Sequence, residues 1–181
     1  MPIRARSTLL LDLDGTLVDT APGIFGCYRH ALASFGVVPS DAEDLRWAIG
    51  PSIREGFRQL LDGRGDAEEA VRRYRERYSE WGLYQGAVYP GILQALAVHR
   101  ARGTRLVLCT AKSHGFARRV ADHFGLTPLL SGLYGSELYG RFEDKAELIA
   151  RRCQVKQPQR EMGPDLPFAR PYNLCLGYNR S

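Results

Sequence analysis

Two carboxylates follow a run of leucines near the start of the chain. Asp12 and Asp14 stand two residues apart, directly after the leucines at 9–11. Side chains two apart on a strand point to the same face, and open parallel sheets bind ligands at the carboxyl ends of their strands. Two neighbouring anions repel one another unless a cation or a shared proton lies between them. The pair therefore predicts a metal site, acid–base chemistry, or both.

The two residues after the acidic pair suit a turn that contacts a ligand. Gly15 lets the backbone turn sharply, and Thr16 offers a hydroxyl and an amide. The alternative interpretation is a strand end whose aspartates are simply solvated. Carboxylates inside an otherwise apolar run are a poor means of gaining solubility, so we favour a role in chemistry.

The eight residues at 12–19, DLDGTLVD, resemble the first motif of the haloacid dehalogenase (HAD) superfamily of phosphatases. The resemblance implies an aspartate nucleophile at Asp12, a general acid/base at Asp14, and Mg²⁺ as the cofactor, held by these two residues. It also implies an α/β fold in which a doubly wound parallel sheet, the Rossmann-like HAD core, carries an inserted α-helical cap.

Two later residues match the order of further HAD motifs. The apolar run at 105–109 predicts a central parallel strand that ends at Thr110. By resemblance, Thr110 and nearby amides such as that of Ala111 grip a phosphoryl oxygen. Lys145, by the same resemblance, screens the charge of the nucleophile from that of the incoming phosphate. Lys112 is interpreted as a loop charge rather than a ligand.

Helical patterns occupy the chain between the acidic pair and this strand. Apolar residues recur at helical spacing from Thr20, a suitable helix cap, to about residue 84. No strand pattern interrupts them. We therefore expect residues 17–88 to form a helical cap, inserted into a core made of residues 1–16 and 89–150.

The cap also contains residues that the resemblance assigns to substrate binding. Gly50 and the side chain of Arg54 are expected to face the substrate, alongside Gly15 and Thr16 of the core. The alternative for Arg54 is a solvated surface charge. The arginines at 72–77 are interpreted in that second way, as the polar face of an amphipathic helix.

The resemblance ends near residue 150. HAD phosphatases complete their metal site with further acids after another apolar strand, and residues 151–181 lack that pattern. The tail holds two carboxylates, Glu161 and Asp165, and both lie among prolines and glycines. We interpret the tail as disordered, or as the truncated or frame-shifted end of a longer parent. A chain without the fourth motif is expected to turn over feebly.

Composition sets the broad class of protein. The 181 residues carry a net charge of +5, which favours anionic ligands, and 44% of them are hydrophobic, enough for a folded core. The four cysteines are widely separated, which argues against a zinc site or a disulfide framework and favours a reducing compartment, the cytoplasm. No sequence stretch predicts a membrane span, and we expect neither a membrane nor a nucleic acid as partner.

These observations predict a Mg²⁺-dependent phosphomonoester hydrolase that acts on a small phosphorylated metabolite. The resemblance is closest to phosphoglycolate phosphatase-like members, and 5′-nucleotidase-like members are similar enough to leave the substrate open. A receiver-type signalling domain also surrounds a phosphorylated aspartate with acids, a threonine and a lysine, but it lacks a helical insertion after its first strand. A non-catalytic phosphate-binding or interaction protein stays open, and the oligomeric state is not predicted.

Overall fold

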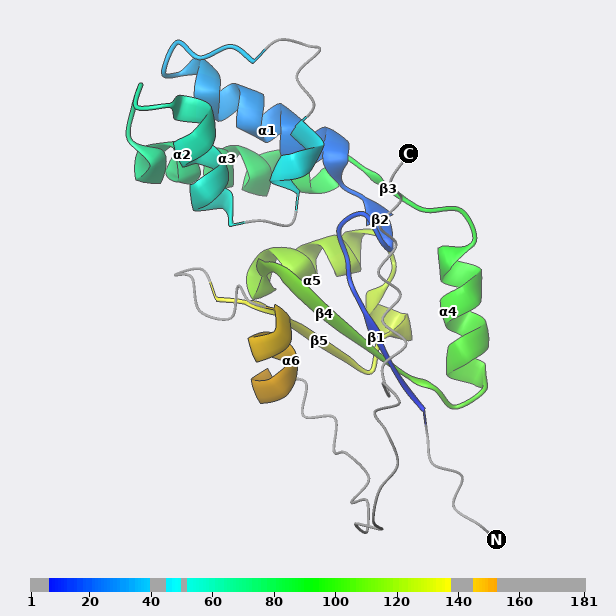
Figure 1. The fold of residues 1–181 in the computed structure, drawn as a ribbon. Coiled ribbons are helices and arrows are strands. Elements are labelled where there is room, and N and C mark those ends of the chain that lie inside the picture. The colour runs from blue at the N-terminus through cyan, green and yellow to red at the C-terminus, as the bar shows by residue number, and fades with distance from the viewer. Residues whose placement is uncertain (1–6, 40–44, 50–51, 138–144, 153–181) are drawn as a thin grey trace, which may run out of the picture.

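Parallel strands form the centre of the molecule (Figure 1). The computed structural model describes residues 7–39, 45–49, 52–137 and 145–152. Strand β4 (Arg105–Ser113) lies between β1 (Thr8–Leu11) and β5 (Gly132–Ser136), and both pairings are parallel. The leucine run and the apolar run at 105–109 are therefore neighbouring strands, as their patterns predict.

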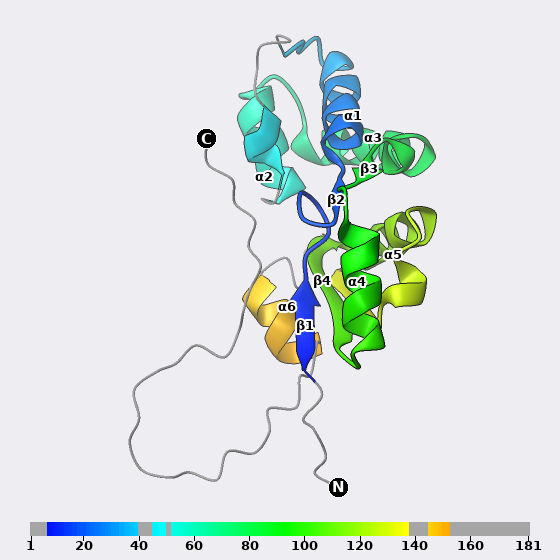
Figure 2. The ribbon, with the colours of Figure 1, turned by 90° about the vertical axis from the view of Figure 1, so that its right-hand side faces the viewer.

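Helices cover both faces of this sheet. Figure 2 shows α6 (Lys145–Arg152) on one side and both α4 (Ile92–Ala101) and α5 (His114–His123) on the other. A short 3₁₀ turn, η3 (Thr127–Leu129), joins α5 to β5. This arrangement confirms the predicted fold class, an α/β doubly wound parallel sheet of the Rossmann type.

Alternate residues of β4 supply the two layers of the core. Leu106 and Leu108 are fully buried on the face that packs against α4 and α5. Val107 and Cys109 point the other way and pack with Ile149 of α6. Burial on both faces explains why this strand is apolar throughout rather than alternating.

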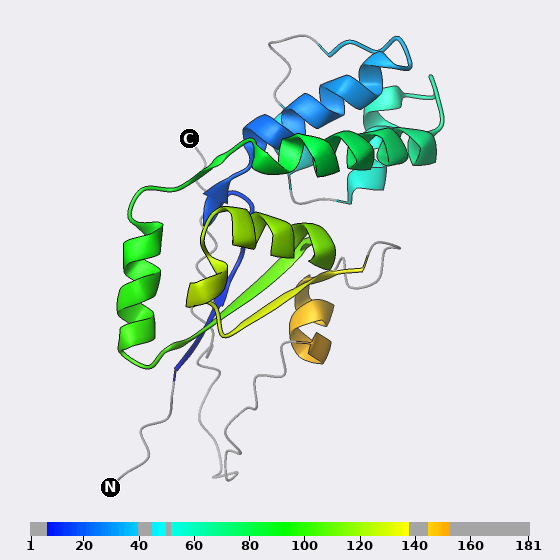
Figure 3. The same cartoon turned by 180° about the vertical axis from the view of Figure 1, so that it is seen from behind.

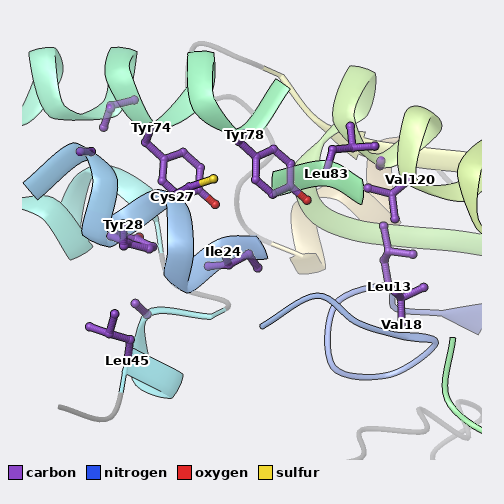
Figure 4. Packing of buried hydrophobic residues seen from close by; sticks show 14 of the residues in the cluster. Leu13, Val18, Ile24, Cys27, Tyr28, Leu45, Tyr74, Tyr78, Leu83 and Val120 are labelled. Atoms are coloured by element: carbon purple, nitrogen blue, oxygen red, sulfur yellow. The ribbon is translucent and has the colours of Figure 1, made fainter. Parts of the chain in front are cut away.

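The helices of residues 21–84, the helical unit, stack above the carboxyl ends of the strands (Figures 1 and 3). The unit comprises α1 (Ala21–Ala33), η1 (Leu45–Ala48), α2 (Ile53–Leu61), α3 (Ala67–Glu80) and η2 (Gly82–Tyr84). Aromatic rings form its centre: Tyr28 lies 4.7 Å from Phe57 and 5.1 Å from Tyr74, measured between ring centroids. Figure 4 shows how this packing continues through Tyr78 and Leu83 towards Val120 of the core.

A two-stranded ribbon joins the helical unit to the core. Strand β2 (Val18–Asp19) pairs antiparallel with β3 (Ala87–Val88). The amide of Tyr89 donates a hydrogen bond to the carbonyl of Leu17 at 3.1 Å, which extends the ribbon by one link. The chain thus leaves and re-enters the core at adjacent points. We keep the boundaries of residues 17 and 88 as our proposal for the inserted cap.

The cysteines depart from the sequence-based expectation. Cys109 is disulfide-bonded, whereas Cys27 is a buried free thiol. Burial raises the pKa of Cys27 to about 11, so this thiol is protonated and unreactive at neutral pH. Spacing along the chain does not reveal which cysteines folding brings together. In the described part of the chain, every helix is too short or too polar to span a bilayer.

Gly23 in α1 approaches η2 too closely to accept a side chain. A Cβ on Gly23 would overlap with the carbonyl oxygen of Gly82. The oxygen belongs to the backbone of η2, and the added Cβ is fixed to the backbone of α1. Neither atom can therefore move aside as the end of a flexible side chain would. We expect Gly23→Ala to lower the free energy of unfolding by about 1–3 kcal/mol, measured by urea denaturation.

Gly115→Ala is the matched control for this substitution. Gly115 is the second residue of α5, and apart from its chain neighbours and the backbone of its own helix no described atom lies within 4 Å of the position its Cβ would take. Its free energy of unfolding should stay the same or rise by up to about 1 kcal/mol, because alanine favours the helix. Equal losses in both variants would contradict the packing argument.

Candidate active site

Asp12 and Asp14 follow the end of β1 and line the same cavity. Leu13, between them, is fully buried on the opposite side, so the side chains alternate as the spacing predicts. The cavity has a volume of about 950 Å³ and lies between the sheet and the helical unit. Its core wall consists of Asp12, Asp14, Gly15, Thr16, Asp19, Tyr89, Thr110, Ala111, Lys112, Ser113, Phe116, Ser136 and Glu137.

A tight turn holds the acidic pair at the cavity. The carbonyl of Leu13 accepts hydrogen bonds from the amides of Leu17 and Val18, at 3.0 and 3.1 Å. Gly15 adopts a left-handed conformation with φ of +71°, which explains the glycine at this position. Both Gly15 and Thr16 line the cavity.

Both carboxylate oxygens of Asp14 have partners. The hydroxyl of Thr20 donates to Oδ1 at 2.7 Å, and the ammonium of Lys112 lies 3.1 Å from Oδ2. Thr20 precedes α1, but its side chain makes no capping hydrogen bond there, so the predicted capping role is wrong. Its hydroxyl instead orients the carboxylate.

Lys112 is not a loop charge, and that interpretation is wrong. It lies within β4, its side chain is 9% exposed, and its Nζ donates to the hydroxyl of Tyr78 at 3.0 Å. Burial by itself lowers the pKa of Lys112, but Asp14 and Tyr78 outweigh that effect and raise the pKa above the usual lysine value. The lysine is therefore a fixed cation at neutral pH.

Thr110 and Ala111 lie beside the acidic pair because β1 and β4 are neighbours. Thr110 is fully buried, its Oγ1 accepts a hydrogen bond from the amide of Lys112 at 3.2 Å, and it lines the cavity. The carbonyl of Ala111 accepts from the hydroxyl of Ser136 at 2.7 Å. Ser136 and Glu137, at the end of β5, also line the cavity and were missed from the sequence. The signal that could have identified them is a polar pair that follows a third strand.

The other predicted site residues are placed less completely. Lys145 is the first residue of α6, but its side chain lies outside the described part of the structure, as does all of Gly50. Arg54 is on α2, where its Nε pairs with Glu68 of α3 at 2.8 Å. Within the described residues, the cavity lining does not include Arg54. Their roles at the site stay predictions.

The helical unit supplies the opposite wall of the cavity. It contributes two arginines and a set of apolar and aromatic side chains: Ile24, Phe25, Tyr28, Arg46, Trp47, Ile49, Ile53, Tyr74, Arg75 and Tyr78. Arg72 and Arg73 do lie on the outer surface, paired with Glu69, as predicted for that face. Arg75, on the same helix, lines the cavity.

Tyr28 gives this wall a pH dependence that can be measured. Burial raises the pKa of Tyr28, so the folded protein keeps the phenolic proton where the unfolded chain loses it. Its contribution to stability is therefore full below about pH 10 and is lost as the pH rises further. We expect Tyr28→Phe to reduce the alkaline loss of unfolding free energy by up to about 1.4 kcal/mol per pH unit, measured by urea denaturation at pH 9–11.5. Tyr84→Phe, which removes the hydroxyl of an exposed tyrosine, is the control for the substitution itself.

The donors at the cavity fit part of a magnesium site. Mg²⁺ prefers oxygen ligands, keeps several waters, and is often held by one or two carboxylates together with a substrate phosphate. Asp12 offers such a carboxylate beside the main chain of Asp14. Among the residues that the structure describes, no three acidic, histidine or cysteine side chains gather closely enough to hold a metal alone. Asp12 and the main chain of Asp14 thus offer some of the oxygen ligands that Mg²⁺ needs, and the oxygens of a bound phosphate group would supply others.

Comparison with known proteins places this arrangement in a family. A family model described as haloacid dehalogenase-like hydrolase matches residues 9–161. A 5′-nucleotidase of Pseudomonas aeruginosa is 40% identical over 142 residues, which are 78% of this chain and 64% of the relative. A phosphoglycolate phosphatase of Cereibacter sphaeroides is 35% identical over 156 residues, 82% of this chain and 72% of the relative. The chain thus spans less than two thirds of the first of these proteins.

A solved structure agrees with the sequence relatives. The haloacid dehalogenase-like family protein SP0104 from Streptococcus pneumoniae superposes with a TM-score of 0.73 at 30% identity, over 82% of this chain and 69% of that protein. The motif at residues 12–19, the sheet and the family model all lead to the same assignment. This chain belongs to the haloacid dehalogenase-like hydrolase family.

Proposed function

We propose that the protein is a Mg²⁺-dependent phosphomonoester hydrolase that acts through an aspartyl-phosphate on Asp12. The observation that carries the proposal is the convergence of Asp12, Asp14 and Thr110 on one cavity from two neighbouring strands. A nucleophilic carboxylate, an acid/base group and hydroxyl or amide donors are the parts that phosphoryl transfer through a covalent intermediate requires.

The proposed reaction has two steps. In the first, a carboxylate oxygen of Asp12 attacks the phosphorus, the bond from phosphorus to the ester oxygen breaks, and Asp14 gives its proton to the departing alcohol. In the second, Asp14 takes a proton from water as the water attacks the phosphorus. Inorganic phosphate leaves, and Asp12 regains its free carboxylate. Through both steps the hydroxyl of Thr110 and the amide of Ala111 hold phosphoryl oxygens.

Asp12 and the main-chain carbonyl of Asp14 are the proposed magnesium ligands from the described residues. Bound Mg²⁺ supplies charge neutralisation of the phosphoryl oxygens. Lys145 opens α6 and is proposed to screen the negative charge between Asp12 and the phosphate. Residues 151–181 of the sequence lack the acidic pattern of a fourth motif. For this stretch of chain, which holds one carboxylate fewer, we propose slow turnover rather than none.

The substrate is proposed to be a small phosphorylated metabolite. Phosphoglycolate is one candidate, because a relative named phosphoglycolate phosphatase is 35% identical. A 5′-nucleotide is the second candidate, because the cavity of about 950 Å³ has an aromatic wall and exceeds what a two-carbon acid fills. Phosphorylated metabolites are mostly intracellular, and the cytoplasm is the location we propose.

The test is an assay of phosphate release with phosphoglycolate, adenosine 5′-monophosphate and p-nitrophenyl phosphate, with Mg²⁺ or with EDTA. We expect slow hydrolysis with Mg²⁺ and a loss of at least about 100-fold in EDTA. Phosphate binding without turnover, unaffected by Mg²⁺, would select the alternative of a non-catalytic phosphate-binding protein. Vigorous turnover would instead contradict the proposed deficit in the metal site.

A further inference from the structure

Three side chains from three elements meet at one end of the cavity. Lys112 of β4 places its Nζ 3.1 Å from the Oδ2 of Asp14 and 3.0 Å from the hydroxyl of Tyr78. Tyr78 belongs to α3 of the helical unit, whereas Asp14 and Lys112 belong to the core. The lysine is therefore a direct link between the acid/base candidate and the helical unit.

Lys112 has little freedom to leave this position. Its amide is tied to the hydroxyl of Thr110, and its Nζ lies 4.7 Å from the centre of the ring of Tyr78, as in a cation–π contact. Its side chain is almost entirely buried, so an ammonium that left Asp14 and Tyr78 would lose an ion pair and a hydrogen bond. The position of the ammonium thus depends on the position of Tyr78.

Tyr78 is itself fixed by rings on both sides of the interface. Its ring stacks on that of Tyr74 within α3, 5.6 Å away and nearly parallel. It also meets the ring of Phe116 of α5 edge to face, at 5.2 Å. A helical unit that moved away from the sheet would carry Tyr78 off both Phe116 and Lys112.

We propose that Lys112 positions the carboxylate of Asp14 for proton transfer, and that Tyr78 holds Lys112 there only while the helical unit packs on the sheet. The inference rests on the acid/base role proposed for Asp14. Thr20, at the ribbon end of the helical unit, holds the other oxygen of the same carboxylate at 2.7 Å. The two oxygens of Asp14 therefore contact different segments: Oδ1 contacts Thr20, just before α1, and Oδ2 contacts Lys112, which Tyr78 of the helical unit holds in place.

The link from Tyr78 through Lys112 to Asp14, which we call the bridge, can be tested by the kinetics of two conservative variants. Lys112→Met keeps the length of the side chain but removes the charge, and we expect kcat to fall by about tenfold or more with KM within about twofold. Tyr78→Phe keeps the ring but removes the hydroxyl. We expect kcat to fall by about fivefold, which is the change in rate that corresponds to the net free energy of one hydrogen bond. Lys112→Arg retains the charge and should recover part of the loss.

Tyr84→Phe is the matched control. Its hydroxyl accepts a hydrogen bond from Arg119 at 3.2 Å in the same interface between the helical unit and α5, away from Lys112. Activity should be unchanged in this variant. A higher KM with normal kcat in Lys112→Met would mean that the lysine binds substrate, and equal losses in Tyr84→Phe and Tyr78→Phe would mean general weakening of the interface. Either result overturns the proposal.

A spectroscopic measurement separates this inference from the proposed function. The ¹³C chemical shift of the Asp14 carboxyl is expected to move in both Lys112→Met and Tyr78→Phe and to stay in place in Tyr84→Phe, whether or not the protein turns over substrate. If the wild type hydrolyses nothing, the proposed function fails while the bridge is still judged by these shifts. An Asp14 carboxyl that does not respond to Tyr78→Phe rules the bridge out.

Discussion

Replacing Asp12 with asparagine is expected to lower kcat by at least about a thousandfold. The amide oxygen of asparagine is a poor nucleophile and cannot carry the phosphoryl group, so the first step has no acceptor. Asp12 lines the cavity beside Asp14, and the substitution preserves its shape. Steady-state assays with Mg²⁺ give the change in kcat. Intact mass after acid quenching shows a phosphoryl adduct in the wild type that is missing from the variant.

The control for this experiment is an aspartate outside the cavity. Asp62 ends α2 in a left-handed conformation with φ of +47°, which asparagine adopts readily. Asp62→Asn should therefore keep both its activity and its stability. A kcat for Asp12→Asn within tenfold of the wild type would falsify the role of Asp12 as nucleophile.

Asp14→Asn is expected to slow the hydrolysis of an alkyl phosphate by about 10²–10⁴-fold. The leaving alcohol of such an ester needs a proton from a general acid, and the amide of asparagine is far too weak an acid to supply one. The loss should be much smaller for the first step with p-nitrophenyl phosphate, because nitrophenolate departs without protonation. Rapid-quench measurements with both substrates separate this step from the second one.

The second step should be slow in Asp14→Asn with either substrate, because the attacking water also lacks its base. The phosphorylated protein is then expected to accumulate with p-nitrophenyl phosphate, which intact mass detects. Asp122→Asn, on the surface of α5, is the control. If both substrates lose the same factor in the first step, Asp14 orients the substrate rather than donating a proton.

The chemistry of the core wall could be predicted from the sequence because it depends on short-range patterns. Side chains two residues apart on a strand point to the same face, and this alternation predicted that Asp12 and Asp14 lie together. An apolar run that ends in a hydroxyl residue indicates the carboxyl end of a buried strand, which placed Thr110 beside them. Neither prediction required knowledge of the helical unit.

The residues that sequence reasoning missed depend on contacts between distant segments. Lys112 follows the expected end of the strand at Thr110, but β4 continues to Ser113 with a shift in register against β5. That irregularity turns an expected loop charge into a buried one. Its partner Tyr78 lies 34 residues earlier in the chain, on a helix whose tyrosines Tyr74 and Tyr78 are buried at helical spacing. The pattern alone does not show what the tyrosine hydroxyl faces.

The ribbon of β2 and β3 has an evolutionary consequence. Asp19 and Ala87 are direct partners across it, so the two ends of the helical unit emerge from neighbouring points of the backbone. A core built in this way keeps its sheet hydrogen bonds whatever sequence is spliced between those points. An insertion at these points can therefore change in length or sequence while β1 and β4 keep their pairing, and with it the neighbouring positions of Asp12 and Thr110.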